Sequence, residues 1–261
     1  MPPTNVSRMS RTLVLLVVLP VALYLALCAA LFVFQRALIY YPQARSDASA
    51  PLLSLAVDDV QVNVSTRPYN GPKALIYFGG NAEDVSRSLP SFAKAFPDHA
   101  LYFIHYRGYG GSGGSPSEEA IARDAMALFD KVYAEHPQIL VVGRSLGSGV
   151  AVRLASVRPV TELLLVTPYN SIEELAARRF RLFPVHWLLT DKFESWRYAE
   201  HIGVPTRLIA AENDEVIPAA STQRLYHHFP KGVATLRVIP GTGHNSISES
   251  PEYLKALAAP D

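Results

Sequence analysis

Two serines in this chain lie at the centre of a Gly-x-Ser-x-Gly pattern, which can hold a serine nucleophile on a sharp turn. They are Ser145 and Ser112. The pattern alone is weak evidence for a nucleophile, so the residues around each match decide which serine it is. The apolar run 139–142 leads directly into the first match, and a helical stretch rich in small residues, 147–155, follows it. That strand-turn-helix context predicts Ser145 as the nucleophile, whereas Ser112 is predicted to be an ordinary residue of a glycine-rich loop.

A serine hydroxyl is a poor nucleophile near neutral pH, so it needs a base and a group that orients the base. Asp214 follows the apolar run 207–211, and His244 lies in a glycine-flanked loop after the run 236–239. A lone aspartate or histidine in a loop usually has no catalytic role. The order Ser, Asp, His, with each residue after its own strand, predicts a Ser145–Asp214–His244 triad. Glu212 and Glu215 are the less favoured acids.

Acyl transfer also requires two donors for the oxyanion that forms on the substrate. The backbone N–H of Leu146, directly after the nucleophile, is the first candidate. The second is expected from the loop 78–84, where two glycines follow an apolar run. No cofactor or metal is implied by this set of residues.

Five segments together resemble the α/β-hydrolase superfamily: 78–82 (FGGNA), 106–110 (YRGYG), 143–147 (GRSLG), 213–214 (ND) and 243–244 (GH). The likeness covers about residues 55 to 260. It is strongest to membrane-associated α/β-hydrolase-domain proteins related to depalmitoylating thioesterases, and to bacterial serine-aminopeptidase-like hydrolases. The resemblance implies that Asn81 and Leu146 form the oxyanion hole. Gly79 stands where the family usually has histidine, and Ala211 where it usually has glycine.

The elements that must position these residues alternate along the chain. Continuous apolar runs of four or five residues are typical of parallel strands covered on both faces. They alternate with helical patterns such as the amphipathic stretch from Ser117 to Pro137. This predicts an α/β fold with a doubly wound, mostly parallel sheet. An apolar cluster within 180–189, beside three arginines, predicts a cap helix or a lid that receives an acyl chain close to a bilayer. The strands are expected at 60–64, 74–78, 101–104, 139–142, 163–166, 207–210 and 236–239.

The N-terminal segment from Thr12 to Phe34 contains no charged residue. A helix of this length would cross the ~30 Å hydrocarbon core. A cleaved signal peptide would have a shorter apolar region. Arg8 and Arg11 flank one end, and Arg36 and the pair 40–41 (YY) flank the other, where we expect them to lie at the membrane interface. We therefore predict a single-pass anchor in residues 1–40, with its helix at about 12–34, followed by a linker in 41–54 and a catalytic domain in 55–261. The slight excess of positive charge on the N-terminal flank predicts that the catalytic domain lies on the non-cytoplasmic side.

The bulk composition narrows the function further. The net charge is +1 and the basic residues are scattered, which argues against a nucleic-acid partner. Cys28, the single cysteine, lies inside the apolar run, so the chain alone can form no disulfide framework. We expect a hydrolase of a lipid-like or small acyl ester or thioester. A peptidase or amidase, and a catalytically silent scaffold of the same fold, are the alternatives.

Overall fold

The sheet that carries the predicted site has a mixed edge and a parallel centre. In this computed structural model, which describes residues 6–47 and 49–258, eight strands are ordered β1-β2-β4-β3-β5-β6-β7-β8. β2 is antiparallel to both of its neighbours, and the other adjacent strands are parallel. The predicted doubly wound α/β fold is therefore confirmed. The strands are β1 (Leu52–Val57), β2 (Val60–Arg67), β3 (Lys73–Phe78), β4 (Ala100–Ile104), β5 (Gln138–Arg144), β6 (Glu162–Val166), β7 (Thr206–Ala211) and β8 (Ala234–Ile239).

Helices cover both faces of this sheet because its central strands are apolar on both sides. Along β3, Ala74 and Ile76 belong to one buried cluster and Leu75 and Tyr77 to the other, as expected for side chains that alternate along a strand. The first cluster includes side chains of α3, α4, α7 and α8, and the second includes those of α2 and α9. These helices are α2 (Leu89–Ala95), α3 (Glu118–Tyr133), α4 (Leu146–Ala155), α7 (Ser195–Ala199), α8 (Ala219–His228) and α9 (Pro251–Ala258).

The helix α3 illustrates how the sequence sets these elements. Ser117 has extended backbone geometry, and its side chain accepts a hydrogen bond from the N–H of Ala120, which caps the first turn. Ile121, Leu128 and Val132 lie on the buried face of the helix. The helix predicted from the amphipathic pattern between Ser117 and Pro137 is thus present, and it ends one turn before the proline.

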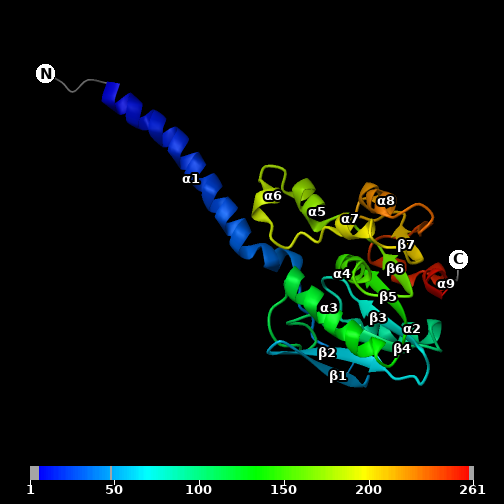
Figure 1. The fold of residues 1–261 in the computed structure, drawn as a ribbon. Coiled ribbons are helices and arrows are strands. Elements are labelled where there is room, and N and C mark those ends of the chain that lie inside the picture. The colour runs from blue at the N-terminus through cyan, green and yellow to red at the C-terminus, as the bar shows by residue number, and fades with distance from the viewer. Residues whose placement is uncertain (1–5, 48, 259–261) are drawn as a thin grey trace.

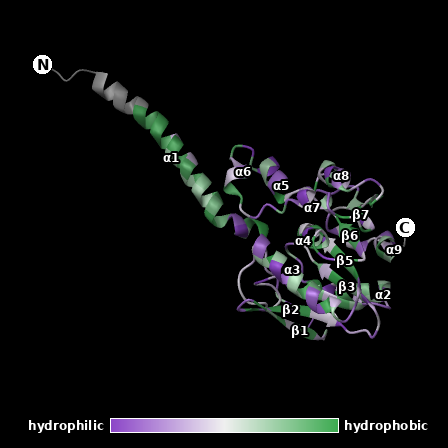
Figure 2. Cartoon of the chain, viewed as in Figure 1, coloured by the Kyte–Doolittle hydropathy of each residue, from purple (hydrophilic) through white to green (hydrophobic). Residues whose placement is uncertain are grey.

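The helix α1 (Val6–Ile39) projects from the α/β domain as a long rod (Figure 1). It extends beyond the predicted limits of 12 and 34 at both ends. Its part from Val14 to Ile39 is long and apolar enough to cross a membrane, by length and composition. Hydrophobic residues follow one another along most of the rod, and hydrophilic ones gather where it meets the domain (Figure 2). Tyr40, expected at a membrane interface, is instead buried in the domain.

A cap lies between β6 and β7, beside the domain end of α1 (Figure 1). We define the cap as residues 172–190, which contain α5 (Ile172–Arg179) and α6 (Val185–Leu188). Ser171 caps α5 by accepting a hydrogen bond from the N–H of Glu174. The strand β1 was not predicted, and it begins within the segment expected to be a linker.

Candidate active site

Ser145 lies on the turn between β5 and α4. Its backbone angles, φ 49° and ψ −118°, are unusual for a residue with a side chain. Two glycines permit this turn. A Cβ atom on Gly147 would lie 2.1 Å from the Phe78 carbonyl oxygen, and one on Gly143 would lie 2.4 Å from the Gly147 carbonyl oxygen. The glycine spacing therefore lets α4 start against the ends of the central strands, with the serine on the turn above them.

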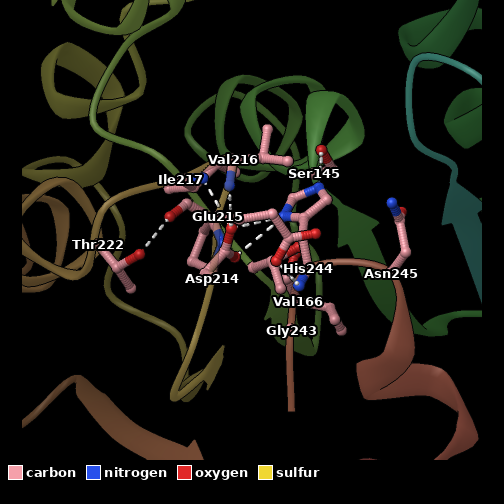
Figure 3. Close-up of polar contacts among 12 residues, drawn as sticks. Ser145, Val166, Asp214, Glu215, Val216, Ile217, Thr222, Gly243, His244 and Asn245 are labelled. Atoms are coloured by element: carbon pink, nitrogen blue, oxygen red, sulfur yellow. Dashed lines mark hydrogen bonds and ion pairs between the residues drawn. The ribbon is translucent and has the colours of Figure 1, made fainter.

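Within the predicted triad, His244 lies within hydrogen-bonding distance of both Ser145 and Asp214 (Figure 3). The imidazole Nε2 of His244 is 2.9 Å from the Ser145 hydroxyl oxygen, and its Nδ1 is 2.9 Å from Asp214 Oδ2. The carboxylate can only accept, so Nδ1 carries the proton and Nε2 faces the serine as an acceptor. The His244 and Asp214 side chains are almost completely buried, at 7% and 6% exposure. This is the arrangement that a general base and its orienting acid require.

The loop after β7 holds both residues in place. Asp214 Oδ1 accepts hydrogen bonds from the backbone N–H groups of Val216 and Ile217, at 2.9 and 2.7 Å. The neighbouring carboxylate of Glu215 accepts the backbone N–H of His244 at 3.0 Å, and this bond lowers the pKa of Glu215. Glu215 thus positions the histidine from its backbone side. From the sequence, Glu215 is only a less favoured candidate for the acid of the triad.

The two predicted oxyanion-hole residues lie beside Ser145. Leu146 is the first residue of α4, so its N–H has no partner within the helix. Asn81 lines the same cavities as Ser145, but its side-chain amide donates to the Ile39 carbonyl at 3.1 Å. Its backbone carbonyl accepts from the Tyr41 N–H at 3.0 Å. The donor that Asn81 can offer to a substrate is therefore its backbone N–H, for which no acceptor is found among the described residues.

Glu83 fastens this oxyanion loop to the nucleophile turn. Its carboxylate accepts hydrogen bonds from the Gly80 N–H and the Tyr77 hydroxyl, both at 2.8 Å. It also pairs with Arg144, the residue before the nucleophile, at 3.1 Å. Burial alone would lower the pKa of Arg144, but the charge and hydrogen bond of Glu83, together with two nearby tyrosines, raise it. No motif in the sequence identified this ion pair, because its partners are 61 residues apart.

The structure also explains why glycine occupies position 79 and what Ser112 does. A Cβ atom on Gly79 would lie 2.5 Å from Val85 Cγ1, so a histidine at this position would require the loop to shift. The Ser112 hydroxyl accepts from the Asn63 N–H and donates to the His105 carbonyl, both at 2.8 Å. Ser112 is buried and holds the loop after β4 against β2.

Two hollows of different character meet at Ser145. One is an apolar cavity of about 380 Å³ between the nucleophile, the cap and α1. The other is a polar cleft of about 660 Å³ whose lining includes Arg144, His244 and Asn245. Ser145 and Asn81 line both. Within residues 6–47 and 49–258, no group of three or more His, Cys, Asp or Glu residues could hold a metal ion.

Comparisons with known proteins agree with this architecture. No family model matches the chain. The protein Rv2307c of Mycobacterium tuberculosis is 32% identical over 257 residues, which cover 90% of each chain. The lysophosphatidylserine lipase ABHD12 of Macaca fascicularis is 31% identical over 217 residues, covering 70% of this chain and 54% of that protein. The esterase Pf2001 of Pyrococcus furiosus has the same fold, with a TM-score of 0.67 at 17% identity over 84% of this chain and 97% of the esterase. The sheet order, the nucleophile turn and the similarity to these relatives together show that the chain belongs to the α/β-hydrolase family.

Proposed function

We propose that this protein is a membrane-anchored serine hydrolase that cleaves the ester or thioester bond of an acyl-chain substrate. One observation carries the proposal: the Ser145 hydroxyl lies 2.9 Å from the His244 imidazole at the junction of an apolar cavity and a polar cleft. An acyl chain fits the first and a polar leaving group the second. The relative named as a lysophosphatidylserine lipase supports a lipid-like substrate.

The proposed reaction has two steps. In the first, His244 Nε2 takes the Ser145 proton as the serine oxygen attacks the acyl carbonyl, and the same proton is then given to the departing alcohol or thiol. In the second, His244 takes a proton from water, which attacks the acyl-enzyme, and gives that proton to the Ser145 oxygen as the free acid leaves. Asp214 stabilises the imidazolium that forms in both steps. The backbone N–H groups of Leu146 and Asn81 are proposed to bind the oxyanion.

Labelling with a fluorophosphonate tests the nucleophile. Wild-type protein should form a covalent adduct, and Ser145→Ala should not, because only an activated serine attacks phosphorus at a useful rate. Ser112→Ala is the matched control, since it removes the serine of the other Gly-x-Ser-x-Gly pattern, and it should still be labelled. Absence of labelling in the wild type would instead support a silent scaffold.

The bond type is tested by comparing substrates. We expect hydrolysis of p-nitrophenyl acyl esters and of acyl thioesters to exceed that of aminoacyl p-nitroanilides, because the apolar cavity contains no carboxylate that would bind the free amine of a peptide. A preference for aminoacyl amides would contradict an esterase and identify a peptidase.

The membrane topology is part of the same proposal. The span Val14–Ile39 is proposed to cross the bilayer once. The N-terminal flank carries Arg8 and Arg11, against Arg45 beyond the other end, since Arg36 lies within the span and pairs with Asp191. Because positive charge is retained in the cytoplasm, this small excess favours a catalytic domain on the non-cytoplasmic side.

A further inference from the structure

The anchor helix forms one wall of the cavity at the proposed nucleophile. Leu31, Gln35 and Leu38 of α1 line the apolar cavity, and so do Phe180 and Leu188 of the cap. A helix that only anchored the domain to a membrane would contribute no residues to the site. Here the cavity exists because α1 closes one side of it.

Specific contacts fasten α1 to the cap along much of its length. Near the domain, the Gln35 amide donates to the Leu188 carbonyl at 3.1 Å and accepts from the Thr190 N–H at 2.7 Å. Farther out, the Tyr24 hydroxyl donates to the Leu182 carbonyl at 2.9 Å. The cap is therefore held to α1 at two positions that are 11 residues apart along the helix.

These contacts set the depth of the cap relative to the apolar span. Tyr24 precedes Ile39 by 15 residues, which is about 22 Å along a helix. Only the uncharged part from Thr12 to Tyr24, about 18 Å, extends beyond the cap. This is little more than half of the ~30 Å that a hydrocarbon core requires. If α1 crosses a bilayer, the tip of the cap must therefore lie within the leaflet on the domain side.

The surface of the cap tip has the composition that such a position demands. Leu182 and Trp187 are 83% and 82% exposed, although both are large and apolar. Three exposed basic side chains, Arg178, Arg179 and Arg181, lie near them in the sequence. Apolar side chains with neighbouring arginines suit the boundary between lipid tails and headgroups.

We propose that the tip of the cap inserts into the leaflet beside α1, and that an acyl chain of a bilayer lipid moves from the leaflet along α1 to Ser145. The proposal rests on the proposed hydrolase function and names the source of its substrate. The tail stays among apolar side chains throughout the transfer, so it need not pass through water. The polar cleft on the other side of Ser145 receives the leaving group.

Tryptophan quenching tests the insertion, because the chain has only two tryptophans. Trp187 is on the cap tip, whereas Trp196 is on α7 and contacts His228 of α8. The full chain would be reconstituted in phosphatidylcholine vesicles that contain a doxyl-labelled phosphatidylcholine. The Trp196→Phe variant, which keeps Trp187, should lose its fluorescence. The Trp187→Phe variant, which keeps Trp196, should lose little. Equal quenching of the two, or none, would overturn the insertion.

Acyl-chain selectivity tests the route along α1. Leu31→Trp would fill the cavity from the side of α1, while Val33→Trp, two residues away on the exposed side of the same helix, is the matched control. With p-nitrophenyl esters in phosphatidylcholine vesicles, Leu31→Trp should lower the ratio of palmitate to butyrate hydrolysis by about tenfold or more, because a blocked apolar pocket discriminates by chain length. Val33→Trp should retain the wild-type ratio.

The outcomes separate this inference from the proposed function. A wild-type protein that hydrolyses neither ester would contradict the hydrolase itself. A wild type that hydrolyses both, with the same palmitate-to-butyrate ratio in Leu31→Trp, would leave the hydrolase intact and overturn the route along α1.

Discussion

The side chain of Asn81 points toward the end of α1, where it donates to the Ile39 carbonyl, and not toward a substrate. Its proposed catalytic contribution is the backbone N–H, which any residue except proline supplies. Asn81→Ala should therefore weaken only the positioning of the loop, and kcat should fall by about tenfold or less, against about 10²–10³ for loss of a complete donor. Kinetics with p-nitrophenyl butyrate would check this. A fall of three orders of magnitude would show that the amide side chain itself binds the oxyanion.

Single functional residues could be predicted from the sequence where a local sequence pattern surrounds them. Ser145 could be distinguished from Ser112 by the strand before it and the helix after it, and the structure gives the Ser112 hydroxyl two structural hydrogen bonds. Asp214 and His244 were chosen by order along the chain; they lie together, and their catalytic role stays a prediction. Glu83 and Glu215 could not be identified as positioning residues, because their partners depend on how loops distant in sequence meet.

Among the elements, strands and helices with a clear hydrophobic period were predictable, and those that depend on partners were not. The continuous apolar runs predict the central strands, and the structure confirms that these runs form strands. The strand β1 (Leu52–Val57) is an edge strand that pairs with β2, and the prediction misses it although five of its six residues are apolar. The cap was recognised as an apolar cluster, but its division into α5 and α6 follows from packing against the domain and α1.

The pairing of β2 with the end of β4 also gives this fold a sensitivity to acid. His105 follows β4 and lies 2.8 Å from the Ser65 hydroxyl of β2, and its burial lowers its pKa to about 4. In the unfolded chain the value would be near 6.5, so below that pH the unfolded state binds a proton that the folded state does not. The free energy of unfolding should therefore fall as the pH drops from about 6.5 to about 4, by about 3 kcal/mol at most from this group.

Denaturation of wild type, His105→Asn and His201→Asn at pH 7 and at pH 4.5 would measure this contribution. His105→Asn should lose less stability than the wild type between the two pH values, although it starts from a lower value. The exposed His201 provides the control, whose variant should follow the wild type. An equal pH dependence in all three proteins would show that His105 does not contribute.

For the whole molecule, the sequence predicts an apolar membrane anchor, but no pattern in it indicates that this helix contacts the candidate site. Tyr40 is predicted from the sequence to lie at the membrane interface, yet its hydroxyl donates to the buried Asp191 at 2.9 Å. Arg36 pairs with the same carboxylate at 3.1 Å. These contacts join positions more than 150 residues apart, which no local pattern can reveal.

The side of the membrane that holds the domain can be measured with introduced thiols. In a Cys28→Ala background, Lys231→Cys on the domain surface should react with a membrane-impermeant maleimide in intact cells. Ser7→Cys, on the other flank of the apolar run, should react only after permeabilisation. The positive-inside rule gives this expectation, and the opposite labelling pattern would reverse the proposed topology.

The bond between the Asn81 amide and the carbonyl of Ile39 ties the last turn of α1 to the loop beside the nucleophile. With α1 in a bilayer, Ser145 then stands at a constant height relative to the membrane plane. A lipid bond at that height is within reach, and a bond of the same chemistry a few ångströms higher or lower is not. Which bond is cut would then depend on geometry as well as on the identity of the headgroup.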